Sequence, residues 1–242
     1  MRTDEYQRIN ELASFHFWYQ GSRDLLEKLI RKYSKGKNPK ILDAGCGPGA
    51  MLPALVKFGQ VFGIDISSEA LKFCKERNFE VKKGTVEKIP FKDNFFDLVI
   101  CFEVLYHKDV DNPQKAIGEF FRVLKPGGFL ILREPAFTFL FRTHDKVVQT
   151  ARRFTKKDLV DLFKGAGFII KKATYTNVFL FLAILIKKLF EVFEKRNSEK
   201  SDLKSLPNWQ NLFFLKFFQM ENFLINFFDF PLGSSVLIVG RK

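Results

Sequence analysis

Three glycines at alternate positions follow a short apolar run in the stretch ILDAGCGPGA, residues 41–50. Glycine loses more conformational freedom on folding than any other residue, so Gly45, Gly47 and Gly49 predict a tight turn or the close approach of a ligand. Two patterns fit this stretch. The pattern Gly45-x-Gly47-x-x-Ala50 is typical of loops that bring a helix N-terminus to a pyrophosphate. The pattern Asp43-x-Gly45-x-Gly47-x-Gly49 takes the preceding acid as part of the unit.

The histidines are the second set of residues that could do chemistry. Imidazole titrates near neutral pH and can serve as a general base toward a hydroxyl group. His107 follows the apolar run DLVICFEV, and His144 stands beside Asp145 in a long connecting segment. We therefore expect His107, or His144 paired with Asp145, to be the base if the reaction needs one. His16 is expected to be structural.

Apolar runs alternate with amphipathic segments along most of the chain. The runs expected to be strands are KILDAG, QVFGIDIS, FEVKKGT, DLVICFEV, GGFLILREP, FIIKKATYTN and SSVLIVGRK. Helices are predicted over about 50–58, 67–78, 112–124 and 155–167, with Ser67 or Ser68 as an N-cap. Strands separated by helices of this length predict a parallel sheet with right-handed crossovers. The fold class is therefore α/β and doubly wound, with ligands at the carboxyl ends of the strands.

Five segments together resemble the class I S-adenosylmethionine-dependent methyltransferases, in particular methyltransferases of type 11. They are the glycine stretch, the segment IDIS that ends the second strand with Asp65, and the segments GTVEKIPFKDNFFDLVICFEVLYH, RVLKPGGFLIL and RRFTKKDLVDLFKGAGF. They follow in this order over residues 40–177. The resemblance implies a Rossmann-like sheet of seven strands, mostly parallel with an antiparallel last strand. It also implies S-adenosylmethionine as cofactor and S-adenosylhomocysteine as product. A dinucleotide site would explain only the first segment.

The resemblance assigns roles to residues of this sequence. Asp65 would hold the ribose hydroxyls, since two carboxylate oxygens can accept from both. Thr85 departs from the family pattern, because the family usually has an Asp there that accepts from the adenine amino group. The predicted cofactor-binding residues are Asp43, Gly45, Cys46, Gly47, Gly49, Asp65, Ile66, Thr85, Val86, Glu103 and Arg23. The predicted substrate-binding residues are Tyr19, Tyr106, Arg152 and Arg153.

An insert rich in phenylalanine is expected to cover the cofactor. Residues 178–233 hold 12 of the 31 phenylalanines of the chain. We expect a helical apolar lid here, between the last two strands. The division is then 1–35 as an N-terminal covering helix, 36–177 as the core, 178–233 as the lid and 234–242 as the final strand. The lid could form an apolar pocket, touch a membrane surface or join two copies in a homodimer.

The basic charge of the chain is concentrated locally. Of the formal net charge of +13, six charges lie in residues 131–177. Arg152 and Arg153 in this segment could hold a phosphate or carboxylate bidentately. A combination of FHFWYQGSR, this loop and the insert is similar to a methyltransferase subgroup linked to surface-glycan and lipid-linked sugar pathways. An amphiphilic acceptor with an anionic group is therefore expected.

Composition limits the remaining alternatives. The N-terminal residues are polar and charged, which does not predict a secretory signal, and no apolar run reaches the about 20 residues of a membrane span. Three cysteines match no metal spacing, so no metal is expected and a reducing, cytoplasmic setting is. A nucleic-acid methyltransferase is less favoured, because EVLY replaces the N/D-P-P-aromatic signature after the fourth strand. A quinone or other isoprenoid methyltransferase and a non-catalytic cofactor-binding partner also stay open.

Overall fold

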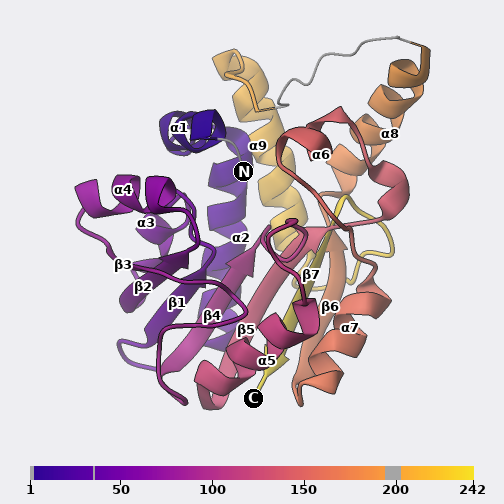
Figure 1. The fold of residues 1–242 in the computed structure, drawn as a ribbon. Helices are drawn as coiled ribbons and strands as arrows, with labels where there is room; N and C mark the ends of the chain where they lie inside the picture. Colours follow the sequence, from indigo (N-terminus) through magenta and orange to yellow (C-terminus); the bar gives the residue numbers. More distant parts are fainter. Residues whose placement is uncertain (1–2, 35, 194–202) are drawn as a thin grey trace.

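The computed structural model describes residues 3–34, 36–193 and 203–242, and a seven-stranded sheet runs through its centre (Figure 1). The strand order is β3-β2-β1-β4-β5-β7-β6, with β7 antiparallel to both of its neighbours and the other neighbouring pairs parallel. The predicted fold class is confirmed. The strands are β1 (Lys40–Ala44), β2 (Gln60–Asp65), β3 (Glu80–Lys83), β4 (Phe96–Phe102), β5 (Leu124–Pro135), β6 (Ile169–Thr176) and β7 (Ser235–Arg241).

Helices cover both faces of the sheet, because the central strands are apolar on both sides. Successive residues of a strand point to opposite faces, so Ile41 packs with one cluster of buried side chains and Leu42 with the other. The first face carries α2 (Phe17–Tyr33), α3 (Leu52–Leu55) and α4 (Ser68–Glu76), and the second carries α5 (Pro113–Val123) and α7 (Lys156–Gly165). The remaining helical segments are α1 (Thr3–Leu12), η1 (Thr138–Leu140), α6 (Thr143–Val147), α8 (Val178–Phe193) and α9 (Asn208–Leu224).

Two segments differ from what their sequence predicts. The covering segment before β1 contains two helices, α1 and α2, where one helix is expected. The helix after the glycine stretch is short and begins at Leu52, because residues 45–51 form turns. Pro48 therefore lies in a turn and not at a helix start.

The insert between β6 and β7 carries α8 and α9, and α9 lies against α2 (Figure 1). The Asn222 side-chain amide donates to the Gly21 carbonyl and to Asp24, both at 2.9 Å. The buried Glu221 carboxylate accepts the backbone N–H groups of Asn177 and Val178, which satisfies donors at the start of α8. Residues 194–202 of the expected lid lie outside the described residues.

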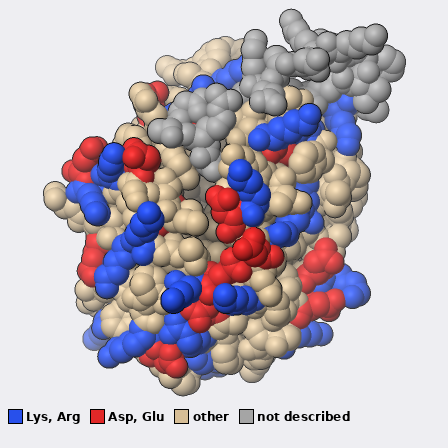
Figure 2. Space-filling view, in the orientation of Figure 1, with Lys and Arg blue, Asp and Glu red and all other residues tan. Residues whose placement is uncertain are grey.

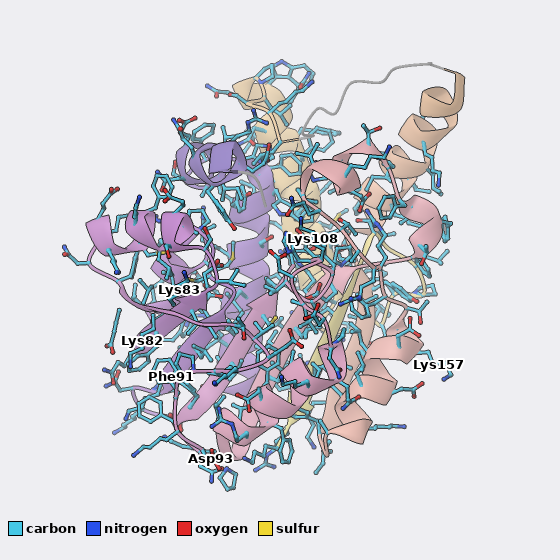
Figure 3. The ribbon with its side chains drawn as sticks, in the orientation of Figure 1. Lys82, Lys83, Phe91, Asp93, Lys108 and Lys157 are labelled. Atoms are coloured by element: carbon cyan, nitrogen blue, oxygen red, sulfur yellow. The ribbon has the colours of Figure 1, made fainter. Side chains whose placement is uncertain are left out.

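Charged side chains are spread over the surface. Figure 2 shows Lys and Arg interspersed with Asp and Glu on the face drawn there. Lys82 and Lys83 lie at the β3 edge of the sheet, Lys157 lies on α7 at the other side, and Lys108 lies between them (Figure 3). On this face the described cations are therefore distributed and not gathered into one stripe.

A glycine in α2, Gly21, allows α9 to pack closely against it, and a substitution can test this contact. A Cβ atom at Gly21 would lie 2.4 Å from Cδ1 of the buried Phe218, whereas a Cβ atom at Gly118 in α5 would meet nothing within 4 Å. We predict that Gly21→Ala lowers the free energy of unfolding by about 1–3 kcal/mol through overpacking. Gly118→Ala should raise it by up to about 1 kcal/mol through helix propensity. Urea unfolding of both variants checks the pair, and equal effects would contradict the packing described here.

Candidate cofactor and acceptor site

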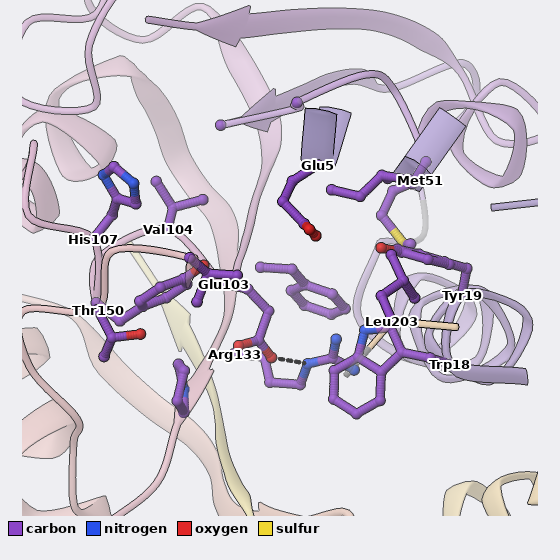
Figure 4. A pocket seen from close by; sticks show the side chains of 18 of the residues that line it. Glu5, Trp18, Tyr19, Met51, Glu103, Val104, His107, Arg133, Thr150 and Leu203 are labelled. Atoms are coloured by element: carbon purple, nitrogen blue, oxygen red, sulfur yellow. Dashed lines mark hydrogen bonds and ion pairs between the residues drawn. The ribbon is translucent and has the colours of Figure 1, made fainter. Parts of the chain in front are cut away.

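A cavity of about 530 Å³ lies at the carboxyl ends of the parallel strands. Its floor comes from the segments that follow β1 to β5 and from the start of β7. Its walls and roof come from α1, the start of α2, the segment 144–153 and the lid. The volume is in the usual range for a site that encloses a small molecule. Figure 4 shows His107 and Thr150 on one side of it and Trp18 and Tyr19 on the other.

Most of the predicted site residues border this cavity. They are Asp43, Gly45, Cys46, Gly47, Asp65, Ile66, Thr85, Val86, Glu103, Tyr19, Tyr106, His107, His144, Asp145 and Arg153. Residues from seven separate stretches of chain are thus brought together. Gly49, Arg23 and Arg152 do not line the cavity.

The three glycines have different reasons to be glycine. All three have positive φ, +81° at Gly45, +51° at Gly47 and +82° at Gly49, which L side chains rarely adopt. A Cβ atom at Gly45 would lie 2.3 Å from Val104, and one at Gly49 would lie 2.9 Å from the Cys74 sulfur. A Cβ atom at Gly47 would meet nothing within 4 Å. The expectation that a ligand lies against all three is therefore corrected: Gly49 makes room for the protein's own core, and Gly47 is the one that faces open space.

Asp65 ties the glycine stretch to the end of β2. One carboxylate oxygen accepts the Gly47 N–H at 2.9 Å and the other accepts the Ser67 N–H at 2.8 Å. Burial raises the pKa of Asp65, and these two N–H donors counteract the rise. Each oxygen keeps a further lone pair, so Asp65 can still accept from a bound diol.

Asp43 is a buried acid with an unsatisfied oxygen. Its side chain is 3% exposed, and its Oδ2 atom has no hydrogen-bond partner among the described residues. Burial, with the nearby charge of Asp65 as a second cause, raises the pKa of Asp43 to about 7. An unpaired buried acceptor is costly, and together with the open space at Gly47 it indicates that a polar ligand completes this end of the cavity.

Glu103 and Arg133 form an ion pair in the cavity floor. Arg133 Nε donates to Glu103 at 3.0 Å (Figure 4). Arg133 Nη1 donates to the Ser22 hydroxyl at 3.0 Å. The guanidinium also lies 5.0 Å from the Trp18 ring centre, within cation–π range. Glu103 has φ +57°, and such a strained backbone at a residue other than glycine is typical of functional sites. Burial raises the pKa of Glu103, and Arg133 opposes the rise.

Glu134 in β5 holds the segment that follows β4 through hydrogen bonds to its backbone. It is fully buried and accepts three successive backbone N–H groups, those of Val104, Leu105 and Tyr106, at 2.9–3.1 Å. Burial, followed by the charge of Glu103, raises the pKa of Glu134 to about 8. The segment that presents Tyr106 and His107 to the cavity is thereby fixed to β5.

His107 and Asp145, the residue expected to pair with His144, already accept hydrogen bonds. His107 Nδ1 accepts the Asp109 N–H at 3.2 Å, so the neutral ring carries its proton on Nε2. Burial lowers the pKa of His107, and the neutral ring therefore presents a donor at Nε2. Asp145 accepts from Arg153 at 2.8 and 2.9 Å and from the Arg142 N–H at 2.8 Å.

The three arginines for which binding roles are predicted already have partners within the chain. Arg153 borders the cavity, but the buried Asp145 neutralises it and the Ala136 carbonyl accepts from it at 3.0 Å. Arg152 donates to the Leu105 and Val110 carbonyls. Arg23 donates to the carbonyls of Ala13, Ser14 and Ala50, which joins the α1–α2 turn to the glycine stretch. His16, expected to be structural, caps α2 by accepting the Trp18 N–H, and it also borders the cavity.

Several residues of the site are missing from the sequence predictions. Arg133 and Glu134 could have been found, because two adjacent charges inside the otherwise apolar strand GGFLILREP are unusual for a buried strand. Glu5 on α1 is 2% exposed and Trp18 borders the ion pair, but the sequence around them carries no comparable signal. Leu180 and Ile184 on α8 line the lid side.

Comparison with known proteins adds the family. Residues 42–132 match the family described as a methyltransferase domain. This stretch of the chain is therefore similar to methyltransferase domains. The match covers the glycine stretch, Asp65 and the strands up to β5, which are the parts that form the cavity floor.

Relatives of this chain differ in how much of it they share. A demethylmenaquinone methyltransferase of Anoxybacillus flavithermus is 27% identical over 204 residues, which are 69% of this chain and 84% of that protein. A tRNA (carboxymethyluridine(34)-5-O)-methyltransferase of Arabidopsis thaliana is 40% identical over 93 residues, 38% of this chain and 23% of that protein. The chain spans 40% to 66% of the length of the first curated relatives it matches.

The fold is shared over nearly the whole chain. A crystal structure of an S-adenosylmethionine-dependent methyltransferase from Thermotoga maritima superposes with a TM-score of 0.63 at 23% identity. The superposition covers 99% of this chain and 95% of that one. The two proteins therefore share their architecture.

S-adenosylmethionine is the cofactor that the methyltransferase similarity supports, and the residues of the cavity fit it. When bound, this cofactor supplies a methyl group activated on a sulfonium. We expect Asp65 to hold the ribose hydroxyls and Gly47 to let the cofactor come close to the backbone. Thr85 and Val86 are expected to border the adenine base. The Glu103–Arg133 pair offers both an acceptor and a donor to the amino-acid end of the cofactor. Because Thr85 stands where the family usually has an Asp, the adenine amino group would meet a weaker acceptor.

Asp65 gives the first test of this assignment. Asp65→Ala removes charge-assisted acceptors, and we predict that the affinity for S-adenosylmethionine falls about tenfold to a hundredfold. Isothermal titration calorimetry measures this change, and thermal melting checks that the variant is folded. Asp161→Ala is the matched control, because Asp161 is an exposed acid on α7 paired with Lys157. An unchanged affinity in Asp65→Ala would remove Asp65 from the site.

Asp43 gives a test through pH. Its pKa is near 4 in an unfolded chain and about 7 in the folded protein, so between these values the folded state binds a proton that the unfolded state lacks. Stability then falls as the pH rises. Between about pH 5 and pH 7.5 we predict that wild type loses about 2–3 kcal/mol relative to Asp43→Asn. Urea unfolding without cofactor measures the difference, and parallel pH profiles would contradict it.

Proposed function

We propose that this chain transfers the methyl group of S-adenosylmethionine to a small acceptor with an apolar body and a neutral polar group. The observation that carries the proposal is the continuity of one cavity from Gly47 and Asp65 to apolar side chains of the lid. The lid side chains are Leu180, Ile184, Leu203 and Leu206. A cofactor at the sheet edge would leave this apolar end for the acceptor.

The polar residues between the two ends suit a positioned acceptor. Methyl transfer is an in-line displacement, so the main contribution of the protein is to align acceptor and methyl group. His107, Thr150 and Tyr106 border the cavity between the cofactor end and the lid. A neutral His107 with its proton on Nε2 can donate a hydrogen bond to the acceptor. To act as a base it would first have to release the Asp109 amide.

A neutral acceptor is favoured over an anionic one. The two arginines expected to hold a phosphate or carboxylate are engaged, Arg153 by Asp145 and Arg152 by backbone carbonyls. A lipid-linked sugar phosphate would need to compete with those contacts. An isoprenoid quinone-like acceptor needs no such cation, and the similarity to a demethylmenaquinone methyltransferase over 69% of this chain supports that class.

An RNA acceptor is the second candidate. The similarity to a tRNA methyltransferase favours it, but that similarity spans 38% of this chain. RNA binding needs cations that follow a backbone, and the described cations on the face in Figure 2 are interspersed with acids. A non-catalytic partner protein is disfavoured by the complete set of Asp65, Gly47 and Asp43 in one cavity.

The proposal is tested by methyl transfer to fractionated acceptors. Methyl-labelled S-adenosylmethionine is incubated with the protein and with separate lipid, soluble-metabolite and RNA extracts, with Asp65→Ala as the control. We expect label in the lipid extract or in an apolar metabolite. Label confined to RNA would contradict the proposal and favour the second candidate. No label in any extract, with intact cofactor binding, would favour the partner protein.

A lid substitution then separates acceptor binding from cofactor binding. Ile184→Asn places an amide at the apolar end of the cavity, where an apolar acceptor cannot pair with it. We predict an acceptor KM raised about tenfold or more, with the cofactor affinity unchanged. Ile169→Asn, an exposed position at the start of β6, is the control. If the acceptor KM of Ile184→Asn stayed at the wild-type value, the lid end would not bind the acceptor.

A further inference from the structure

The lid has an outward apolar surface in addition to its cavity side. On α9 the exposed side chains Trp209, Leu212, Phe213, Met220 and Phe223 recur at helical spacing, so they share one face. They are 45% to 70% exposed. On α8 the exposed side chains Phe179, Leu182 and Ile186 do the same. We name these eight residues the lid stripe.

The two halves of the lid stripe are joined. Phe217 lies between them, with its ring centre 4.8 Å from that of Phe179 and 4.6 Å from that of Phe213. From Trp209 to Phe223 the α9 half alone is about 21 Å long at about 1.5 Å per residue. Single exposed apolar residues are normal on a soluble protein, but a contiguous set of this size marks an interaction surface.

The shape of this surface fits the plane of a membrane and not its depth. Within the described ranges, no helix is both long and apolar enough to cross a bilayer. The lid stripe instead lies along one side of helices whose other side is packed against the protein, as Phe218 is against α2. A helix of this kind lies in the interface with its aromatic and aliphatic side chains at the acyl boundary.

Among the described side chains, the charge around the lid stripe is positive. Lys216 lies within the α9 half, and Lys204 is exposed just before it. The nearby acids are compensated, because Glu221 is buried against backbone N–H groups and Asp229 pairs with Lys172 at 2.7 Å. Long lysine side chains can extend past an apolar surface to reach headgroups, and anionic headgroups attract them.

A second copy of the chain fits the same surface less well. A two-fold interface is self-complementary, and Lys216 lies close to the middle of the α9 half. Pairing two α9 helices about that middle would bring the two Lys216 side chains near each other in an apolar seam, where unpaired charges are costly. The acid that α9 contains, Glu221, is buried against backbone N–H groups and does not reach this surface to neutralise them.

We propose that the lid stripe docks this protein on the surface of a lipid bilayer that contains anionic headgroups. The bilayer covers the outer side of α8 and α9, and the lysines lie at headgroup level. In this position an apolar acceptor could pass from the membrane to the cavity side of α8, a role that rests on the proposed function. Docking itself does not depend on the acceptor.

Vesicle binding by the full chain tests the proposal without turnover. The protein is sedimented with phosphatidylcholine vesicles, with and without phosphatidylglycerol, and we expect tighter binding to the anionic vesicles. Leu212→Ser combined with Phe213→Ser and Phe223→Ser should weaken binding about tenfold or more, because buried apolar area drives it. Lys216→Ala should weaken binding about fivefold, on anionic vesicles alone.

A matched control and a second measurement keep the test decisive. Val56→Ser combined with Ile169→Ser removes two equally exposed apolar side chains outside the lid and should bind vesicles as wild type does. Tryptophan fluorescence of wild type should be quenched by brominated acyl chains, and Trp209→Phe should lose most of that quenching. Thermal melting and cofactor affinity check that each variant is folded.

Two outcomes would overturn the proposal. One is a wild type that does not bind either vesicle. The other is a triple serine variant that binds vesicles like wild type, or that changes a dimer into a monomer, which would make the lid stripe an interface between copies. Either result leaves the proposed methyl transfer standing, since that reaction is measured by label in the acceptor extracts. Conversely, Asp65→Ala should dock normally although it binds the cofactor poorly.

Discussion

The cavity depends on two adjacent ionisable side chains at the end of the buried strand β5. Glu134 accepts three backbone N–H groups of the segment after β4, and Arg133 joins Glu103 of that segment to Ser22 of α2. Buried charges are costly unless they are paired and hydrogen-bonded, and here each has several partners. The pair therefore fixes the relative positions of β4, β5 and α2, which form the floor and one wall of the site.

Much of the fold follows from the sequence because its signals are local. Apolar runs bounded by glycine and capped helices specify strands and helices one at a time, and the crossover rule then gives a parallel sheet. The two errors arise where local signals are weak. The turns after Gly49 leave α3 only four residues, Leu52–Leu55, and the break between α1 and α2 carries no glycine or proline.

The cofactor end of the site could be predicted and the acceptor end could not, for one physical reason. Gly47 lies in a glycine-rich turn directly after β1 and Asp65 ends β2 directly before a capped helix, so each belongs to a short pattern that is visible in the chain. The roles of Arg152 and Arg153 depend on the groups that the folded chain places beside them. Asp145 and the Leu105 carbonyl are the groups that engage them, and no spacing rule indicates such contacts.

Helix α8 shows why the lid needs contacts on both of its sides. Its sequence VFLFLAILIKKLFEVF is apolar almost all round, and such a helix is normally buried on every side. Leu180 and Ile184 face the cavity, whereas Leu182 and Ile186 are exposed. The acceptor can cover the first side only while it is bound, and the folded chain leaves the second uncovered. A helix of this composition is stable at the edge of a protein when an apolar phase outside takes the place of the missing core, and a bilayer surface supplies such a phase.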